Sequence, residues 1–192
     1  GGHGYRVGRL PALIKMRDHG VTPDYIAGLA QHGVRDIPPE AIVRLRDHGV
    51  TPGFLGEFHA LGYRDLPIDS LINLRNHGVT ADYVRTLAEH GIRGVPADQL
   101  TRLRDQGVSP DFVGALKASG YGGFDTEAII SLRNHGVTGD YVRDLRSLGY
   151  TDLTAEDITR LRIHGVTADF IRRSKGAERL SAEQLVRLRI GG

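Results

Sequence analysis

The sequence repeats itself every 29 residues, and this period constrains the fold more than any other feature. A motif of the form Gly-Val-[Thr/Ser]-x-x-[Tyr/Phe] occurs six times, with 29 residues between neighbouring glycines. The anchor glycines are Gly20, Gly49, Gly78, Gly107, Gly136 and Gly165. A fixed period of this size indicates an array of one small unit, in which each copy buries its apolar face against its neighbours. We therefore expect a single repeat array over residues 1–192.

The first half of each unit has the pattern of a short helix. In the unit 21–49, Thr22 suits the N-cap, Pro23 suits the first helical position and Asp24 complements the positive end of the helix. Apolar residues follow at helical spacing, and we expect them to be core: Tyr25, Ile26, Leu29, Phe54, Leu55, Phe58, Tyr83, Val84 and Leu87. A glycine suited to a left-handed C-cap closes each of these helices, at Gly33, Gly62, Gly91, Gly120 and Gly149.

The second half restarts with Pro, Asp or Thr followed closely by an acidic residue, as in Pro38-Pro39-Glu40. Its expected core residues include Ile42, Leu45, Leu71, Leu74, Ile158 and Leu161. Each unit is thus predicted to be two short helices, and helices of about ten residues are marginal alone in water. The predicted fold is all-α, a right-handed α-solenoid of about six and a half two-helix repeats with thirteen helices.

The unit boundaries follow from the anchors. A half repeat spans 4–20, where Gly4-Tyr5-Arg6 matches Gly62-Tyr63-Arg64, and full repeats span 21–49, 50–78, 79–107, 108–136 and 137–165. The last repeat, 166–192, is shortened, because Leu153 and Leu180 are only 27 residues apart. We expect this atypical last repeat to act as a cap.

Composition excludes several classes of protein. The chain has 25 lysine and arginine residues against 23 aspartate and glutamate residues, unlike the strong basic excess of a typical nucleic-acid-binding domain. It has no cysteine, which excludes disulfides and thiolate metal sites and is compatible with both cytosol and periplasm. No apolar run reaches the roughly 18 residues of a membrane-spanning helix. The glycine pairs at both ends are typical of an excised fragment.

The most uniform polar column of the repeat is an arginine near the end of each second helix. It contains Arg17, Arg46, Arg75, Arg104, Arg133, Arg162 and Arg189. Evenly spaced guanidinium groups suit a phosphate backbone or an acidic peptide. The interpretation that we favour is structural: each arginine flanks the buried stripe near the negative end of its helix. There it is expected to bridge to an aspartate of the next helix start, such as Asp24, or to bond unpaired carbonyls.

Two other columns vary from unit to unit and are the better candidates for a binding surface. One lies two residues before the arginine column, roughly opposite the core leucine, and the other lies on the first helices. Their basic members are the candidate binding residues Lys15, Arg44, Arg85, Arg102, Arg143, Arg160, Arg172, Arg173 and Arg187. The alternative is a solvated face that binds nothing.

A histidine precedes most anchor glycines, at His19, His48, His77, His135 and His164, with Gln106 in the remaining unit. Units about 10 Å apart cannot bring two of these side chains onto one zinc ion at ~2.0–2.1 Å, so we predict a structural role. The sequence has no recognisable catalytic triad, glycine-rich phosphate loop or metalloprotease helix motif. We therefore expect no bound metal, no cofactor and no enzymatic activity.

The unit resembles a known tandem repeat. The segments MRDHGVTPDYIAGLAQHGVRDI, LRNHGVTADYVRTLAEHGIRGV and LRNHGVTGDYVRDLRSLGYTDL are similar to bacterial repeats that follow the membrane zinc metallopeptidase domain of beta-lactam-sensor-type proteins. The resemblance extends from Gly4 to Arg189 and implies a bacterial helical accessory or sensing region. The zinc motif of the peptidase is absent from this chain, so no protease activity carries over.

A second, partial resemblance concerns the junction His48-Gly49-Val50-Thr51-Pro52, which is similar to the unit boundary of the DNA-reading repeats of TAL effectors. Those repeats read one base per unit through a residue pair at the end of the first helix. The corresponding pairs are His32-Gly33, Leu61-Gly62, His90-Gly91, Ser119-Gly120 and Leu148-Gly149. Leucine cannot hydrogen-bond a base edge, and the units are several residues shorter than those of TAL effectors.

These observations predict a non-enzymatic binding or scaffold module that engages a protein or peptide through its variable columns. The alternative is TAL-effector-like or non-specific nucleic-acid binding through the arginine columns. An apolar end at Leu10, Leu13 and Ile14 further predicts end-to-end self-association of arrays.

Overall fold

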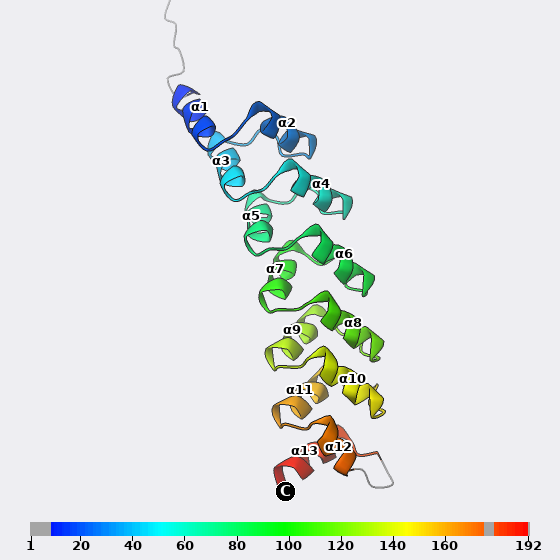
Figure 1. Cartoon of the computed structure of the whole chain (residues 1–192). Coiled ribbons are helices and arrows are strands. Elements are labelled where there is room, and N and C mark those ends of the chain that lie inside the picture. The colour runs from blue at the N-terminus through cyan, green and yellow to red at the C-terminus, as the bar shows by residue number, and fades with distance from the viewer. Residues whose placement is uncertain (1–8, 175–178, 192) are drawn as a thin grey trace, which may run out of the picture. The chain divides into compact units, whose positions relative to one another are not determined.

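The computed structural model describes residues 9–174 and 179–191, and all regular structure in these ranges is helical (Figure 1). The thirteen helices of the described ranges are α1 (Arg9–Asp18), α2 (Pro23–Gln31), α3 (Pro39–Asp47), α4 (Pro52–Ala60), α5 (Ile68–Asn76), α6 (Ala81–Glu89), α7 (Ala97–Asp105), α8 (Pro110–Ala118), α9 (Thr126–Asn134), α10 (Gly139–Ser147), α11 (Ala155–Ile163), α12 (Ala168–Ser174) and α13 (Ala182–Gly191). The predicted all-α fold of two-helix repeats is confirmed. The predicted match at Gly4-Tyr5-Arg6 lies outside the described residues.

The first helix of each unit begins at the predicted hydroxyl cap. Thr22 Oγ1 accepts a hydrogen bond from the Tyr25 N–H at 3.1 Å. The equivalent bond is made by Thr51, Thr80, Ser109, Thr138 and Thr167. The second helices are capped less uniformly. Pro38, Pro67 and Pro96 make no side-chain cap bond, whereas Asp125 and Thr154 do.

Glycine in the left-handed conformation ends both helices of a unit. Gly33, at φ +84°, lets the Val34 N–H turn back to the Leu29 carbonyl at 3.1 Å. Gly49, at φ +70°, closes α3 in the same way. This backbone conformation is available to glycine at no steric cost, and the turn satisfies carbonyls that a helix end leaves open. The predicted C-caps are therefore confirmed, and they reverse the chain within a few residues.

The chain divides into two compact units, Gly1–Arg85 and Thr86–Gly192, with the boundary inside α6. In the first compact unit α2 packs on α4, while α1, α3 and α5 pack in succession. In the second, α8, α10 and α12 form one layer, and α7, α9, α11 and α13 form the other. First helices thus pack on first helices and second helices on second helices, as in a solenoid. A single array over residues 1–192 stays a prediction.

The core is a ladder of equivalent apolar positions. The second-helix leucine is 0% exposed at Leu45, Leu74, Leu103, Leu132 and Leu161. The valine after each anchor glycine is also buried, which we did not predict, although the pattern Gly-Val-Thr contains it. Ile26 was wrongly expected to be core, because it is 37% exposed. No helix precedes α2 in its layer among the described residues, so this side of α2 stays partly open. Leu55, at the same repeat position on α4, is buried because α2 packs on α4.

The face of α1 that points away from α3 is apolar and open. Leu10, Leu13 and Ile14 are 65%, 60% and 44% exposed. Among the described residues, α1 packs chiefly on α3, and no second helix of another repeat stacks on its opposite side. End-to-end self-association through this face stays a prediction.

Alanine at Gly28 should destabilise the first compact unit. A Cβ at position 28 would lie 2.5 Å from Cγ of Pro52, which stands at the start of α4. We expect G28A to lower the free energy of unfolding by about 1–2 kcal/mol, because overpacking outweighs the ~1 kcal/mol of helix propensity that alanine gains. Urea unfolding followed by circular dichroism measures the change.

G53A is the matched control. The nearest atom to a Cβ at position 53, Oγ1 of Thr51, is 3.8 Å away, so this variant should be as stable as the parent or slightly more stable. Equal stability of G28A and G53A would contradict the close packing of α2 on α4.

Candidate functional site

The uniform arginine column lies at the junctions between successive repeats, where it contacts main chain and aromatic rings. Arg75 Nε donates to the Gly49 carbonyl at 3.0 Å, and Arg162 Nε donates to the Gly136 carbonyl at 2.8 Å. The Arg162 guanidinium also lies over the Tyr141 ring, 5.3 Å from its centroid. Similar ring contacts are made by Arg46, Arg75, Arg133 and Arg189. These arginines hold the end of one repeat against the first helix of the next.

The sequence suggested two structural partners for these arginines, the aspartates at the helix starts and unpaired carbonyls. The bonds of Arg75 and Arg162 go to carbonyls. Asp82, Asp140 and Asp169 pair instead with the arginine three residues later in the same helix, at 3.1, 2.6 and 2.6 Å. An i,i+3 spacing places both side chains on one helix face, so the local partner is nearer than the column arginine. Arg17 pairs with its neighbour Asp18 at 3.1 Å.

Tyrosine hydroxyls make a second set of bonds between repeats, which we did not predict from the sequence. Tyr25 Oη donates to the Val50 carbonyl at 2.7 Å, and Tyr141 Oη donates to the Val166 carbonyl at 2.8 Å. Tyr121 Oη donates to the Tyr150 carbonyl at 2.6 Å. Burial raises the pKa of Tyr25 and of Tyr121 to about 12. Burial raises the pKa of Tyr141 as well, so these phenols remain protonated donors at neutral pH.

The histidine column contributes to the same junctions. His19 Nδ1 lies 2.8 Å from Asp47 Oδ1, and His48 Nδ1 lies 2.9 Å from Asn76 Oδ1. Each partner directly precedes the next histidine of the column. His135 Nδ1 instead bonds the Ser131 carbonyl at 2.8 Å within its own repeat. The imidazoles therefore link repeats or cap helices.

The candidate binding arginines are exposed, apart from the half-buried Arg160, but most of them carry a carboxylate partner. Arg102 donates to both oxygens of Glu127, at 2.6 and 3.0 Å, and Arg44 pairs with Asp69 of the next repeat at 2.7 Å. Pairs within one helix are made by Arg85, Arg143, Arg160, Arg172 and Arg187. Lys15 and Arg173 form no ion pair within residues 9–174 and 179–191. The variable columns thus present alternating charges rather than a basic stripe.

Side chains at the ends of the first helices are turned into the protein. Ser119 is 0% exposed, and its hydroxyl has no hydrogen-bond partner among the described residues. His32 and His90 are half-buried and pack over Gly56 and Gly114, where a Cβ would lie 3.1 and 2.9 Å from the imidazole Cε1. A side chain that reads a base must instead project toward the nucleic acid.

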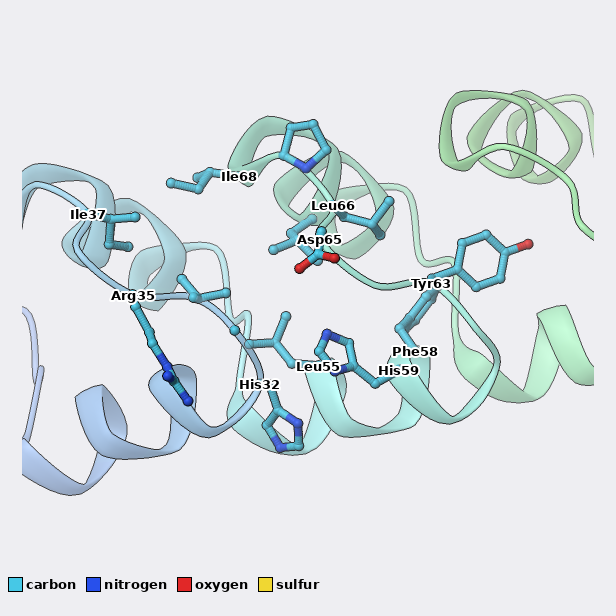
Figure 2. A pocket seen from close by; sticks show the side chains of 14 residues that line it. His32, Arg35, Ile37, Leu55, Phe58, His59, Tyr63, Asp65, Leu66 and Ile68 are labelled. Carbon is cyan, nitrogen blue, oxygen red and sulfur yellow. The ribbon is translucent and has the colours of Figure 1, made fainter.

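A pocket of about 270 Å³ opens in the first compact unit between the C-terminal ends of α2 and α4 (Figure 2). Leu55, Phe58 and Leu71 give it an apolar, buried floor. The polar or ionisable side chains of its lining are those of His32, Arg35, His59, Tyr63 and Asp65. Its volume is below that of most small-molecule sites and suits a single side chain. This pocket was not predicted from the sequence, because its residues come from the loop after α2, from α4, from the loop after α4 and from α5, and they share no motif.

Residues 9–174 and 179–191 contain neither a candidate metal site nor a candidate membrane-spanning helix. No group of three or more histidine, aspartate or glutamate side chains in these ranges is placed to hold a metal ion. Nor does any helix in these ranges have the length and apolar character needed to cross a membrane.

Comparison with known proteins gives no assignment. No protein-family model matches the chain, and no curated protein matches it either. The resemblance to bacterial repeats stays a prediction, and the functional argument rests on the geometry above.

Replacing a column arginine by lysine should weaken the junction between repeats. R162K loses the Nε–H bond to Gly136 and the planar contact with the Tyr141 ring. We expect the free energy of unfolding to fall by about 1 kcal/mol, measured by urea unfolding. R143K is the control, because the interaction that Arg143 makes among the described residues is an exposed pair with Asp140, and its change should stay within about 0.5 kcal/mol. Indistinguishable effects of the two substitutions would contradict the structural role of the column.

Proposed function

We propose that the chain is a non-enzymatic helical-repeat scaffold that binds a protein or peptide along its variable surface columns. The observation that carries the proposal is the difference between the recurrent polar columns, which bond within the protein, and the variable columns, which lie on its surface. Arg75, Tyr25 and His48, which represent the three recurrent columns, bond across the junctions between repeats. The variable columns remain on the surface and differ from repeat to repeat, which is where a repeat array places its specificity.

The paired charges support a polypeptide partner. A phosphate backbone is bound chiefly by unpaired cations that displace its counterions. Here Arg44, Arg102 and Arg143 each already carry a carboxylate partner. A protein surface bears both signs of charge and can complement such pairs. Nucleic-acid binding through the arginines, the alternative from the sequence, also conflicts with the burial of Ser119 at a base-reading position.

The resemblance to bacterial repeats supports the same proposal, because it implies a helical accessory or sensing region without known chemistry. The pocket in the first compact unit adds a concave place where one side chain of a partner fits. Within the proposal, the packed helices of each compact unit supply the surface, and the partner supplies an extended or helical segment.

Selection of peptides from a random display library against the immobilised chain tests the proposal. We expect enriched peptides with dissociation constants on the order of micromolar. Replacing Arg102, Arg143 and Arg160 together by alanine should weaken their binding about tenfold at unchanged helix content, because peptide charges lose their partners. The control variant R17A removes an exposed arginine outside the variable columns and should bind as the parent does.

Titration of a labelled random duplex at low salt is the competing measurement. Micromolar duplex binding together with the failure of any peptide to enrich would contradict the proposal. No duplex binding together with enriched peptides is the result that we expect.

A further inference from the structure

The pocket in the first compact unit carries a carboxylate with an unusual backbone. Asp65 adopts φ +55°, a left-handed conformation that non-glycine residues seldom adopt. The same repeat position holds Asp36 at φ +54° and Gly94 at φ +64°. Glycine fills the position without strain, so the turn does not require an aspartate. What Asp65 adds is a negative charge on the lining of the pocket.

The surroundings of Asp65 favour a positively charged ligand. Its Oδ1 lies 3.6 Å from the place that a Cβ on Gly33 would occupy, beside the end of α2, and it forms no ion pair among the described residues. Both α2 and α4 end at the pocket, so the partial negative charge of their last carbonyls adds to the carboxylate. Among the described residues, Arg35 is the one lysine or arginine that lines the pocket. Its Nε donates to the Ala30 carbonyl at 2.7 Å, which holds the guanidinium beside the end of α2 (Figure 2).

The rest of the lining fits an apolar stem that ends in a flat cation. Leu55 and Phe58 are 1% and 0% exposed and form part of the floor. The imidazoles of His32 and His59 stand edge to face, with centroids 5.4 Å apart, and offer aromatic faces. An arginine side chain packs its methylene groups on apolar surface and stacks its guanidinium on such rings.

The chain already holds an arginine with comparable groups in the second compact unit. The Arg179 guanidinium lies 4.4 Å from the centroid of the Tyr150 ring and bonds Asp152 Oδ1 at 2.5 Å. This hydrogen bond lowers the pKa of Asp152. Tyr150 and Asp152 occupy the repeat positions of Tyr63 and Asp65. The loop at Asp152 does not share the positive φ of Asp65, but its Tyr-x-Asp sequence shows that a tyrosine ring and a carboxylate two residues apart in this repeat are able to bind a guanidinium.

We propose that the pocket between α2 and α4 binds an arginine side chain of the partner polypeptide. The stem lies over Leu55 and Phe58, and the guanidinium stacks on the imidazoles and pairs with Asp65. The inference rests on the proposed function and names the anchor residue of the partner. Lysine lacks the planar fork and should bind more weakly.

Nuclear magnetic resonance titration of the full chain with Nα-acetyl-arginine amide tests the pocket directly. We expect saturable shifts of the His32 and His59 ring signals, with a dissociation constant on the order of 1–10 mM, because one side chain makes few contacts. Nα-acetyl-citrulline amide has nearly the same shape without the charge, and it should bind at least about fivefold more weakly.

Two variants taken from the chain's own repeat positions separate binding from folding. D65G introduces the residue that stands at Gly94 with the same backbone, so it should stay folded while binding weakens about fivefold. H59K introduces the residue found at Lys117, places a cation in the pocket and should abolish binding. D36G is the matched control: it removes an aspartate with the same φ that does not line this pocket, and it should bind as the parent does.

Three results would overturn the inference: no saturable shift up to about 50 mM ligand, equal binding of the citrulline compound, or unchanged binding by D65G. The outcome is separable from that of the proposed function. Library peptides that bind the parent and D65G equally would refute the pocket and leave the scaffold proposal standing. Arginine amide binding together with duplex binding and no enriched peptide would refute the scaffold proposal and leave the guanidinium site standing.

Discussion

The whole structure depends on the contact between one repeat and the next, because its helices are too short to persist alone. Helices α2 to α11 each contain nine residues, below the ~12–15 residues at which an isolated helix becomes even marginally stable. Burial of Leu45 and its equivalents against neighbouring repeats supplies the missing stability. The polar bonds of Arg75 to Gly49 and of Tyr25 to Val50 fix the register between repeats.

This dependence explains why uniformity in the sequence does not mark a ligand site here. Most arginines and histidines that recur every 29 residues contact the neighbouring repeat or the ring of their own first helix. Arg162, for example, satisfies the Gly136 carbonyl and covers the Tyr141 ring. His135 and Arg17 instead bond within their own segments. Positions such as Asp65, where the repeat also accepts glycine at Gly94, are free of this requirement. A partner is best sought at positions of this second kind.

Much of the fold was predictable from the sequence because its signals are local. The hydroxyl cap at Thr22 and the left-handed glycine at Gly33 each act within a few residues, and the period repeats them. Contacts about 25 residues apart were not predictable in the same way. The choice of Arg75 for a carbonyl over an aspartate depends on the distance between elements, which the sequence does not encode directly. The exposure of Ile26 likewise depends on which helices flank α2.

The candidate site was less predictable than the fold. Most basic residues of the variable columns are exposed, as predicted, but Arg160 is half-buried and Ala115 of the first-helix column is buried. The pairing of these arginines with carboxylates of other repeats, as in Arg102 with Glu127, required the register between repeats. The pocket combines residues from the ends of α2 and α4 with Asp65 from the loop after α4, and no spacing in the sequence predicts that these residues meet. Its shape depends on Gly56, which makes room for His32. His32 and Gly56 belong to successive repeats, so their contact can be identified only from the packing of one repeat on the next.

Circular dichroism of a synthetic peptide comprising the single repeat 21–49, compared with the full chain, tests the central claim most directly. If contacts between repeats stabilise the helices, the isolated repeat should show little helix, below roughly a fifth of its residues, while the full chain shows the helical spectrum of the structure. An isolated repeat with the same helix content per residue as the full chain would contradict the account.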